Sequence, residues 1–381
     1  MKFLHTSDWH LGISFGGGIS FAEDQRFAID KICGIAKEEQ VDGILLAGDV
    51  FDRSIASTDA LHLYDEIMTH LCGELGIPVY LIAGNHDGAE RLSQCNELLK
   101  KSGLFIAGAL TKQPQCVNVG DVDIYLLPWI STDKVRAVYP DDADQVTSME
   151  AAYKVVLDKY RASFVPGHKN ILVAHAFITN ASTSVSDRAA EVGRATMVGS
   201  FVFDGFDYVA LGHLHGPQQI GPKIRYSGTP MIYSFGKEEK QEKSVTIIDT
   251  DSSEQRTVPI PQLRRRTTLR GTYEELIRGD VEDEIRNGYV RIEVTDRYVG
   301  TDTFAAFKEV YGRILEISGK SLEREDAKIT MTIEEFEQAN TDPEAVFARY
   351  CKDILEEDPG ERLIGLFRKA VEKYEKGVNA Q

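Results

Sequence analysis

Long apolar runs are absent from this sequence, and so is an apolar N-terminus. No stretch of its 381 residues approaches the roughly 18 consecutive apolar residues of a membrane-spanning helix. The first residues, MKFLHTSD, lack the apolar core of a secretory signal peptide. We therefore expect no membrane span, no secretory leader and a cytoplasmic location.

Cysteine is scarce and unpatterned. The five cysteines are odd in number, scattered along the chain and never arranged as C-x-x-C. This excludes a disulfide framework and a cysteine-rich structural zinc site. The pattern is typical of small buried side chains in a protein of the reducing cytoplasm.

Positively charged residues are fewer than negatively charged ones, with 43 lysines and arginines against 60 aspartates and glutamates. The formal net charge of −17 argues against a protein that coats nucleic acid by bulk electrostatics. A nuclease is still compatible with it, because bound divalent cations reverse the local charge of an acidic site and a partner subunit can supply a basic surface. Residues 12–20 are glycine-rich, but no Gly-Lys-Ser/Thr follows them, so a phosphate-binding P-loop is not expected there.

What the sequence does contain is an alternation of apolar strands and amphipathic helices, which predicts an α/β fold. Strands are expected at residues 2–7, 41–47, 79–83, 120–127, 171–174, 208–211, 223–227 and 243–249, and helices at 21–39, 56–74, 89–101 and 148–162. The run 41–47 is apolar almost throughout, as in a strand that is buried on both faces.

Polar side chains able to bind a metal follow five of these strands. They are Asp8 and His10, then Asp49, then Asn85 and His86, then His175, and finally His213 with His215. Five of the nine histidines belong to these groups, and the others (His5, His62, His70, His168) are interpreted as core or surface residues. Ligands in α/β sheets bind at the carboxyl ends of strands, so these groups are expected to converge.

The residue types indicate a centre with two metal ions. Two divalent cations need a shared carboxylate and further nitrogen and oxygen ligands, and they can hold a hydroxide and offer positive charge to a phosphate. Mixed imidazole, carboxylate and carboxamide ligands suit Mn, Fe or Zn. Taken singly, each group has a structural explanation, because Gly, Asn and Asp favour turns and a lone histidine is often a core residue. The joint order D-x-H, G-D-x-x-D, G-N-H-D, H and G-H-x-H favours the metal centre.

The character of the chain changes near residue 259. Pro259, Pro261 and the basic run Arg264–Arg266 indicate a boundary, and the basic run is either a phosphate contact or a solvated linker. Beyond it we expect strands at 267–271, 289–295 and 327–333, and helices at 273–279 and 302–317. Two amphipathic helices, near 343–356 and 360–376, complete the chain.

The ordered motif set resembles the calcineurin-like metallophosphoesterase superfamily over residues 1 to about 250. More narrowly, the segments Thr6–Gly12 (TSDWHLG), Ala47–Arg53 (AGDVFDR), Ala210–His215 (ALGHLH) and Tyr226–Pro230 (YSGTP) resemble the SbcD family. The resemblance implies a four-layer, two-sheet sandwich flanked by helices at residues 1–260. It also implies a small α/β capping domain at 267–335 that contacts DNA, and a C-terminal helix pair at 341–378.

The same resemblance assigns roles to the strand-end residues. It implies one metal held by Asp8, His10, Asp49 and His215, and a second held by Asp49, Asn85, His175 and His213. Both ions are most often manganese in the family, and His86 is implied as the non-ligand histidine that protonates the leaving group. Some relatives have a phosphate-binding histidine where this chain has Asp52. A carboxylate would repel phosphate, so Asp52 is expected to orient His86 or to accept from the backbone.

The function implied is that of the nuclease subunit of an SbcC–SbcD-type complex in DNA repair and recombination. Such subunits are 3′→5′ exonucleases on double-stranded ends and endonucleases on hairpins or single strands. An SbcC-type ATPase would dock on the helix pair 341–378, and a homodimer would form through helices near 56–74 and 89–101. For both surfaces, packing within the chain is the alternative. A small-molecule or cyclic-nucleotide phosphodiesterase is the alternative function, and the presence of every ligand opposes a non-catalytic scaffold.

Overall fold

The computed structural model describes residues 1–15, 19–179, 181–183, 197–297, 299 and 301–319, with a few residues between 344 and 369. The chain divides into two units. The first comprises Met1–Glu293 and Gly300–Ile317, and the second comprises Val294–Val299 and Ser318–Gln381.

The first sheet of the larger unit contains six strands in the order β16-β15-β1-β4-β5-β6. They are β16 (Gln255–Pro259), β15 (Ser244–Asp249), β1 (Lys2–Thr6), β4 (Gly43–Leu46), β5 (Val79–Ile82) and β6 (Leu104–Ala107). The four strands from β1 to β6 run parallel, whereas β15 and β16 each run antiparallel to their neighbours. Strands β4 and β5 are buried at every residue, which explains their continuous apolar sequences.

The second sheet also contains six strands, in the order β13-β14-β12-β9-β8-β7. They are β13 (Gln218–Ile220), β14 (Ile224–Tyr226), β12 (Tyr208–Gly212), β9 (Lys169–His175), β8 (Val122–Leu127) and β7 (Cys116–Val119). The central strands β14, β12, β9 and β8 are parallel, and the edge strands β13 and β7 are antiparallel to their neighbours.

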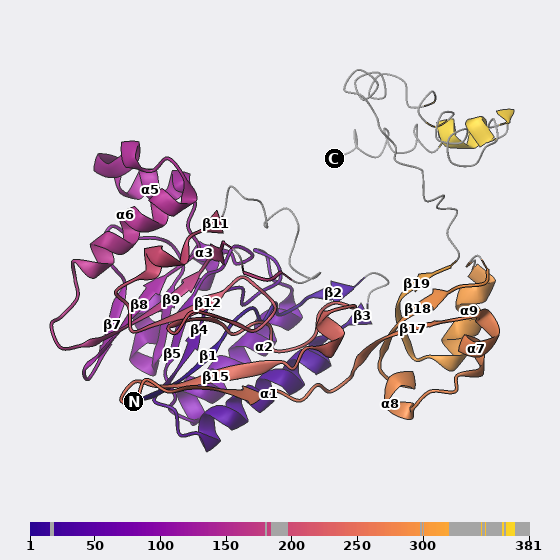
Figure 1. The fold of residues 1–381 in the computed structure, drawn as a ribbon, viewed down its shortest axis with the longest axis horizontal. Helices are drawn as coiled ribbons and strands as arrows, with labels where there is room; N and C mark the ends of the chain where they lie inside the picture. The colour runs from indigo at the N-terminus through magenta and orange to yellow at the C-terminus, as the bar shows by residue number, and fades with distance from the viewer. Residues whose placement is uncertain are drawn as a thin grey trace. The chain divides into compact units, whose positions relative to one another are not determined.

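The two sheets pack face to face and helices cover both outer faces (Figure 1). One cluster of buried side chains joins the sheets and includes Phe3, Tyr80 and Tyr208. Between the sheets, His5 lies 2.9 Å by Nδ1 from the Tyr208 hydroxyl and 3.1 Å by Nε2 from the carbonyl of Leu211. Burial lowers the pKa of His5 to about 3, so it is a neutral core residue, as predicted. The predicted four-layer, two-sheet sandwich is confirmed.

Helices α1 (Ala22–Glu38) and α2 (Thr58–Met68) cover the first sheet, and α5 (Thr132–Val138) and α6 (Met149–Arg161) cover the second. Helix α2 continues as a wider π-helical segment over Thr69–Glu74. The single helix expected over 89–101 is wrong. The segment forms α3 (Ala89–Leu92), α4 (Asn96–Leu99) and a short 3₁₀ turn, because Cys95 adopts a left-handed conformation with φ of 59° and interrupts the helix.

Short elements complete the larger unit. They are the strands β2 (Ser14–Phe15), β3 (Ile19–Ser20), β10 (Phe177–Ile178) and β11 (Met197–Val198), and 3₁₀ helices at Pro140–Gln145, Ser200–Phe203 and Glu238–Lys240. The glycine-rich segment predicted as a loop therefore carries the β2–β3 ribbon, and residues 16–18 lie outside the described part. None of the helices in the described ranges is long and apolar enough to cross a membrane.

A three-stranded sheet, β17-β18-β19, follows the change of sequence character near residue 259. Its strands are β17 (Arg266–Gly271), β18 (Tyr289–Val294) and β19 (Arg313–Ser318), and its helices are α7 (Tyr273–Arg278), α8 (Asp283–Arg286) and α9 (Thr301–Val310). The helix expected over 302–317 is wrong beyond Val310. Gly312 disfavours helix, and the β-prone RILEIS segment pairs as a strand instead. The strand expected at 327–333 lies outside the described residues.

Within the basic run Arg264–Arg266, two arginines are engaged inside the chain, whereas the Arg265 side chain stays 64% exposed. Arg264 donates to Asp24 over 2.6 Å, and Arg265 pairs with Glu284. Arg266 is 4% exposed, and its guanidinium carbon lies 4.6 Å from the ring centre of Phe21. The run therefore ties the beginning of the three-stranded module to the helical layer of the first sheet.

Most of the two C-terminal helices predicted at 343–356 and 360–376 lies outside the described residues, although Leu363–Lys369 is helical. Within the second unit, the Phe347 and Phe367 rings stack with centroids 4.2 Å apart. Arg368 also donates to both carboxylate oxygens of Glu344. These contacts support packing between the two segments.

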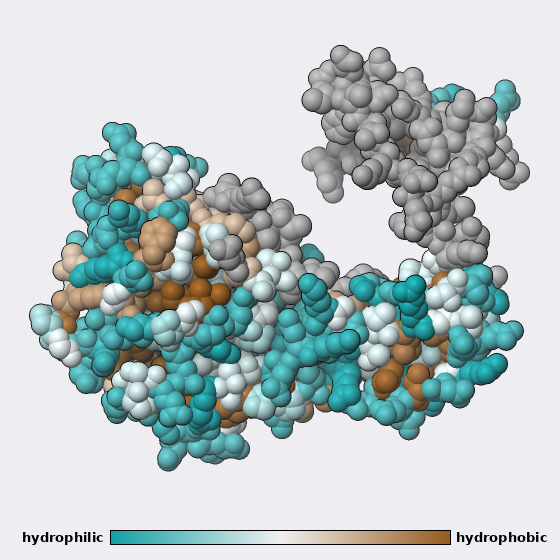
Figure 2. Space-filling view, viewed as in Figure 1, coloured by the Kyte–Doolittle hydropathy of each residue, from teal (hydrophilic) through white to brown (hydrophobic). Residues whose placement is uncertain are grey.

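Figure 2 shows mainly hydrophilic residues on the visible face, with smaller hydrophobic patches among them. Only eight large apolar side chains are exposed in the described part of the chain, among them Ile55, Leu61 and Leu98. Most large apolar side chains of the sandwich therefore lie in its three buried clusters.

Candidate metal centre

The five strand-end groups predicted from the sequence meet at one place. They follow β1, β4 and β5 of the first sheet and end or follow β9 and β12 of the second. The residues brought together are Asp8, His10, Asp49, Asn85, His86, His175, His213 and His215. All but Asn85 are buried, at 9% exposure or less. The carboxyl edges of both sheets thus form a single polar site in a largely dry environment.

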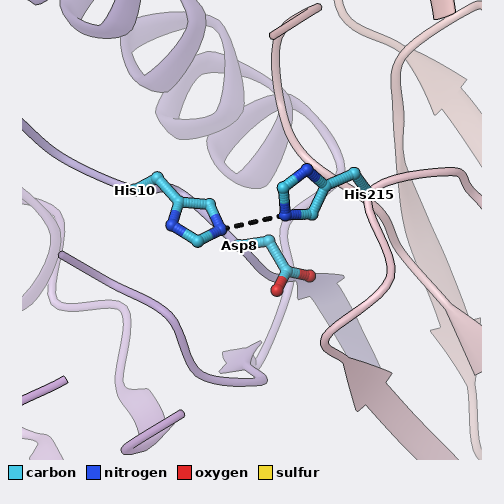
Figure 3. A group of neighbouring side chains, drawn as sticks. All are labelled: Asp8, His10 and His215. Carbon is cyan, nitrogen blue, oxygen red and sulfur yellow. Dashed lines mark hydrogen bonds between the residues drawn. The ribbon is translucent and has the colours of Figure 1, made fainter. Parts of the chain in front are cut away.

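Asp8, His10 and His215 form one half of this site (Figure 3). The His10 and His215 rings approach with their Nε2 atoms 3.1 Å apart, and the Asp8 carboxylate lies beside them. One Asp8 oxygen accepts from the backbone N–H of His213, and the other is buried without a hydrogen-bond partner among the described residues. The Nδ1 atom of His10 is also buried without one. Burial of polar atoms without partners raises the free energy of the folded state unless another group binds to them.

Asp49 lies in the middle of the site. One of its oxygens, Oδ2, is 3.3 Å from His175 Nε2 and 3.8 Å from His10 Nε2. The other, Oδ1, accepts a 2.9 Å hydrogen bond from the backbone N–H of His86. Asp49 therefore contacts both the His10 side and the His175 side, as expected of a shared ligand.

Asn85, His175 and His213 form the second half. The Asn85 side-chain oxygen lies 2.9 Å from His175 Nε2 and 3.1 Å from His213 Nδ1. His175 Nδ1 donates to the carbonyl of Ala47 over 2.8 Å, which directs Nε2 into the site. Trp129 stacks on the His213 ring, with centroids 5.2 Å apart and planes 20° apart. These contacts hold three donor atoms toward one point.

The ionisable groups of the site shift one another's pKa values. Burial, with a smaller contribution from Asp49, raises the pKa of Asp8 to about 7. Burial also disfavours ionisation of Asp49, but nearby His175 and His10 outweigh it and hold the pKa of Asp49 well below its usual value. Burial opposes a charge on His175, yet Asp49 raises the pKa of this ring to about 9. Two neighbouring buried carboxylates are stabilised by bound cations.

His86 is held differently from the other histidines. Its Nδ1 lies 2.9 Å from the main-chain carbonyl of Asp52, and its Nε2 lies 4.0 Å from Asp49 Oδ2. Because a carbonyl only accepts, Nδ1 carries the proton and Nε2 is directed toward the site. The main-chain carbonyl of Asp52 thus orients His86, and the role predicted for the Asp52 carboxylate stays a prediction. That carboxylate lies 3.9 Å from His10 Nδ1.

Strained backbone accompanies the ligands. Asp8, His10, Asp49 and His213 are four of the seven non-glycine residues with positive φ in the described part of the chain. Such conformations cost on the order of 1–3 kcal/mol each and persist only where the surroundings enforce them. Their concentration here supports a functional site rather than a set of ordinary turns.

Gly84 is required for the close approach of β4 and β5 at this edge. A Cβ atom on Gly84 would lie 2.1 Å from Asp49 Oδ1 and 2.4 Å from the Asp49 backbone nitrogen. We predict that Gly84→Ala displaces Asp49, destabilises the fold by about 1–3 kcal/mol and weakens metal binding. Thermal unfolding and manganese titration would measure the two effects.

Gly34→Ala is the matched control for this substitution. Gly34 lies inside α1, and a Cβ there would contact nothing within 4 Å. The control should gain roughly 0.5–1 kcal/mol of stability, because alanine favours helix over glycine, and it should keep metal binding unchanged. If Gly84→Ala behaved like this control, the packing constraint at Asp49 would be refuted.

Sequence reasoning missed several residues that support the ligands. Asp87 accepts hydrogen bonds from the backbone N–H groups of Val50, Phe51 and Gly84, so it fixes two of the strand ends. It belongs to the G-N-H-D motif, which was a signal that could have identified it. Gln25 and Trp129 belong to no sequence motif, so nothing in the sequence identified them as supporting residues.

The donor set suits the metal ions expected from the sequence. Imidazole nitrogens, carboxylate oxygens and one carboxamide oxygen converge, and no cysteine is among them. Three of the buried side-chain atoms without a hydrogen-bond partner among the described residues lie at this site: Asp8 Oδ2, His10 Nδ1 and the Asn85 amide nitrogen. The residues present therefore fit a centre for divalent cations.

Comparison with known proteins agrees with this geometry. Residues 1–217 match the family model for calcineurin-like phosphoesterases, and residues 259–354 match a model described as the type 5 capsule protein repressor C-terminal domain. A crystal structure of TT1561 from Thermus thermophilus aligns at a TM-score of 0.42 and 12% identity, covering 68% of this chain and 99% of that chain. So distant a likeness adds nothing further.

Two curated relatives are much nearer in sequence, and each is named as the D subunit of the nuclease SbcCD. The relative from Staphylococcus epidermidis is 32% identical over 322 residues, covering 84% of this chain and 85% of the relative. The relative from Staphylococcus saprophyticus is 30% identical over 377 residues, covering 98% and 97%. Together with the match of residues 1–217, these similarities show that the chain belongs to the SbcD family of calcineurin-like phosphoesterases.

Proposed function

We propose that this chain is the nuclease subunit of an SbcC–SbcD-type complex and hydrolyses phosphodiester bonds of DNA. The observation that carries the proposal is the convergence of six further nitrogen- and oxygen-bearing ligand residues around the buried carboxylate of Asp49. Relatives of similar length that are named as this nuclease subunit support the choice of substrate. The expected activities are 3′→5′ exonuclease action on double-stranded ends and endonuclease action on hairpins or single strands.

Two divalent cations, most often manganese in the family, would be held by these ligands. Asp8, His10, Asp49 and His215 would hold the first, and Asp49, Asn85, His175 and His213 the second. When bound, the cations would supply positive charge that binds the phosphate and balances the charge developing on it. The ligand side chains contribute by keeping their donor atoms fixed, through the backbone hydrogen bonds described above.

His86 is proposed as the general acid. Its Nδ1–H stays on the carbonyl of Asp52, so Nε2 is the ring atom that exchanges a proton. In the proposed step the protonated ring transfers the Nε2 proton to the departing 3′-oxygen as the phosphorus–oxygen bond breaks. The main-chain hydrogen bond keeps the ring orientation unchanged before and after the transfer.

The remaining parts of the chain are proposed to serve DNA and partner binding. Residues 1–260 form the nuclease domain, residues 267–335 cap it and contact DNA, and residues 341–378 dock on an SbcC-type ATPase. A homodimer would use helix α2 and the segment 89–101 with its two short helices; Ile55, Leu61 and Leu98, in or next to these parts, are exposed at 69%, 49% and 66%. The partner would also supply positive surface, because this chain has a net charge of −17.

A cleavage assay tests the proposal. Purified chain with manganese, alone and with its ATPase partner, would be incubated with end-labelled duplex, hairpin and single-stranded DNA and with bis-p-nitrophenyl phosphate. We expect manganese-dependent cleavage of DNA, with far slower turnover of the small ester. Failure to cut any DNA under all conditions would refute the proposal, and equal turnover of both substrates would favour a small-molecule phosphodiesterase.

A further inference from the structure

We propose that Gln25, in the first turns of α1, is a positioning residue for the cation held by Asp8, His10 and His215. Its buried amide fixes the backbone of residues 9–12, and this backbone sets the place of the His10 ring. The inference rests on the proposed two-cation centre and deepens it, because it names a residue that controls one cation and not the other.

The Gln25 side chain is 2% exposed and contacts the loop at three points. Its Nε2 donates to the carbonyl of His10 over 2.7 Å and lies 3.2 Å from the carbonyl of Trp9. Its Oε1 accepts from the backbone N–H of Gly12 over 3.1 Å. One amide thus satisfies backbone groups on both sides of Leu11.

The orientation of this amide is determined by its neighbours. Carbonyl oxygens of Trp9 and His10 require a donor, and the N–H of Gly12 requires an acceptor, so an exchange of Nε2 and Oε1 would break every contact. The Tyr233 hydroxyl closes the network, because it donates to the Trp9 carbonyl over 2.6 Å and accepts from Gln25 Nε2 over 3.1 Å. The network is therefore fully specified within the described residues.

This loop needs such support because its backbone is strained. Asp8 and His10 have φ of 54° and 44°, a left-handed conformation that L-residues disfavour. On one side the loop pairs with the segment after β4, through the bond from His10 N–H to the Asp49 carbonyl. On the other side, the amide nitrogen of Gln25 donates to the carbonyls of Trp9 and His10. Without the amide, the second side of the loop would keep only the bond from the Tyr233 hydroxyl to the Trp9 carbonyl and the bond from the Ile13 N–H to the His10 carbonyl.

The network touches one half of the metal centre. The Tyr233 ring stands edge-on to His10 and His215, with centroids 6.0 and 6.3 Å apart. The second half is oriented instead by the bond from His175 to the Ala47 carbonyl and by Trp129 on His213. Loss of the Gln25 amide is therefore expected to loosen one cation selectively.

The test is calorimetric titration of the full chain with manganese chloride. Gln25→Met keeps the length of the side chain and removes its hydrogen bonds, and we expect one cation to bind about 10- to 100-fold more weakly with the other unchanged. Tyr233→Phe removes one hydroxyl and keeps the ring, and it should weaken the same cation by about fivefold. His10→Ala identifies that cation, because it removes a ligand from it.

Asn96→Leu is the matched control for the loss of a supporting amide. Asn96 accepts from the N–H of Ile106 and donates to its carbonyl, and neither partner belongs to the metal centre. We expect a lower melting temperature with both manganese affinities unchanged. Wild-type affinities in Gln25→Met and Tyr233→Phe, or equal weakening of both cations in them, would overturn the positioning role. Wild-type protein that bound fewer than two cations would instead overturn the proposed centre.

Discussion

Replacement of Asp49 by alanine is expected to lower DNA cleavage by at least about 1,000-fold. The two cations together supply several kcal/mol of stabilisation to the charge that develops on the phosphate, and each 1.4 kcal/mol corresponds to about tenfold in rate. Asp49 is the carboxylate that approaches both His10 and His175, so its removal deprives both cations of a ligand. We therefore expect the variant to bind at most one manganese ion per chain.

The measurements are the initial rate on end-labelled duplex and the manganese content of the dialysed protein. Asp123→Asn is the matched control, because Asp123 is also a buried strand carboxylate but bonds to His168 and Asn118 near the beginning of β8. The control should keep two ions and near-wild-type cleavage. Two ions bound by Asp49→Ala would contradict the role of Asp49 as the shared ligand.

Replacement of His86 by serine is expected to lower cleavage by roughly 100- to 10,000-fold, the usual contribution of a general acid, while two manganese ions remain bound. The metal content distinguishes an acid from a ligand, and this matters because a nitrogen of His86 lies near donor atoms of His10 and Asp49. Loss of one ion in this variant would show that His86 is a ligand and would refute its assignment as the acid.

A substrate with sulfur in place of the departing 3′-oxygen sharpens this test. A thiolate leaves without a proton, so the difference between wild type and His86→Ser should shrink to about tenfold or less on this substrate. His62→Ser, at an exposed histidine of α2, should cleave both substrates like the wild type. An equal loss on oxygen and sulfur substrates in His86→Ser would contradict proton transfer by His86.

The local part of the fold could be predicted from the sequence. Fully apolar runs such as Gly43–Leu46 and Val79–Ile82 are buried strands, and α1 and α6 appear within a residue or two of their predicted bounds. These elements are recognisable because their hydrophobic period is a local property. The face-to-face packing of two sheets depends on contacts such as His5 with Tyr208, distant in the chain, and was expected only from the family resemblance.

The errors have local physical causes. The left-handed Cys95 splits the helix expected at 89–101, although cysteine gives no sign of such a conformation. The segment Arg313–Ser318 fits either periodicity, and pairing in the three-stranded sheet decides for a strand. Such decisions depend on tertiary context, which a single sequence does not display.

The candidate site also has a part that could be predicted from the sequence and a part that could not. Its predicted ligands stand at strand ends, where topology brings them together, so their pattern was visible along the chain. The residues that hold the ligands in place, such as Gln25 and Trp129, act through backbone carbonyls and ring stacking. Any segment that packs nearby can supply such contacts, and they leave no spacing in the sequence.

The role of Asp49 as a ligand shared by two cations can be observed in a crystal. It is tested most directly by anomalous diffraction at the manganese edge from crystals of the chain grown with manganese. We expect two anomalous peaks, on either side of the Asp49 carboxylate. One would be contacted by Asp8, His10 and His215, and the other by Asn85, His175 and His213. A single peak, or a second peak held by other residues, would contradict it.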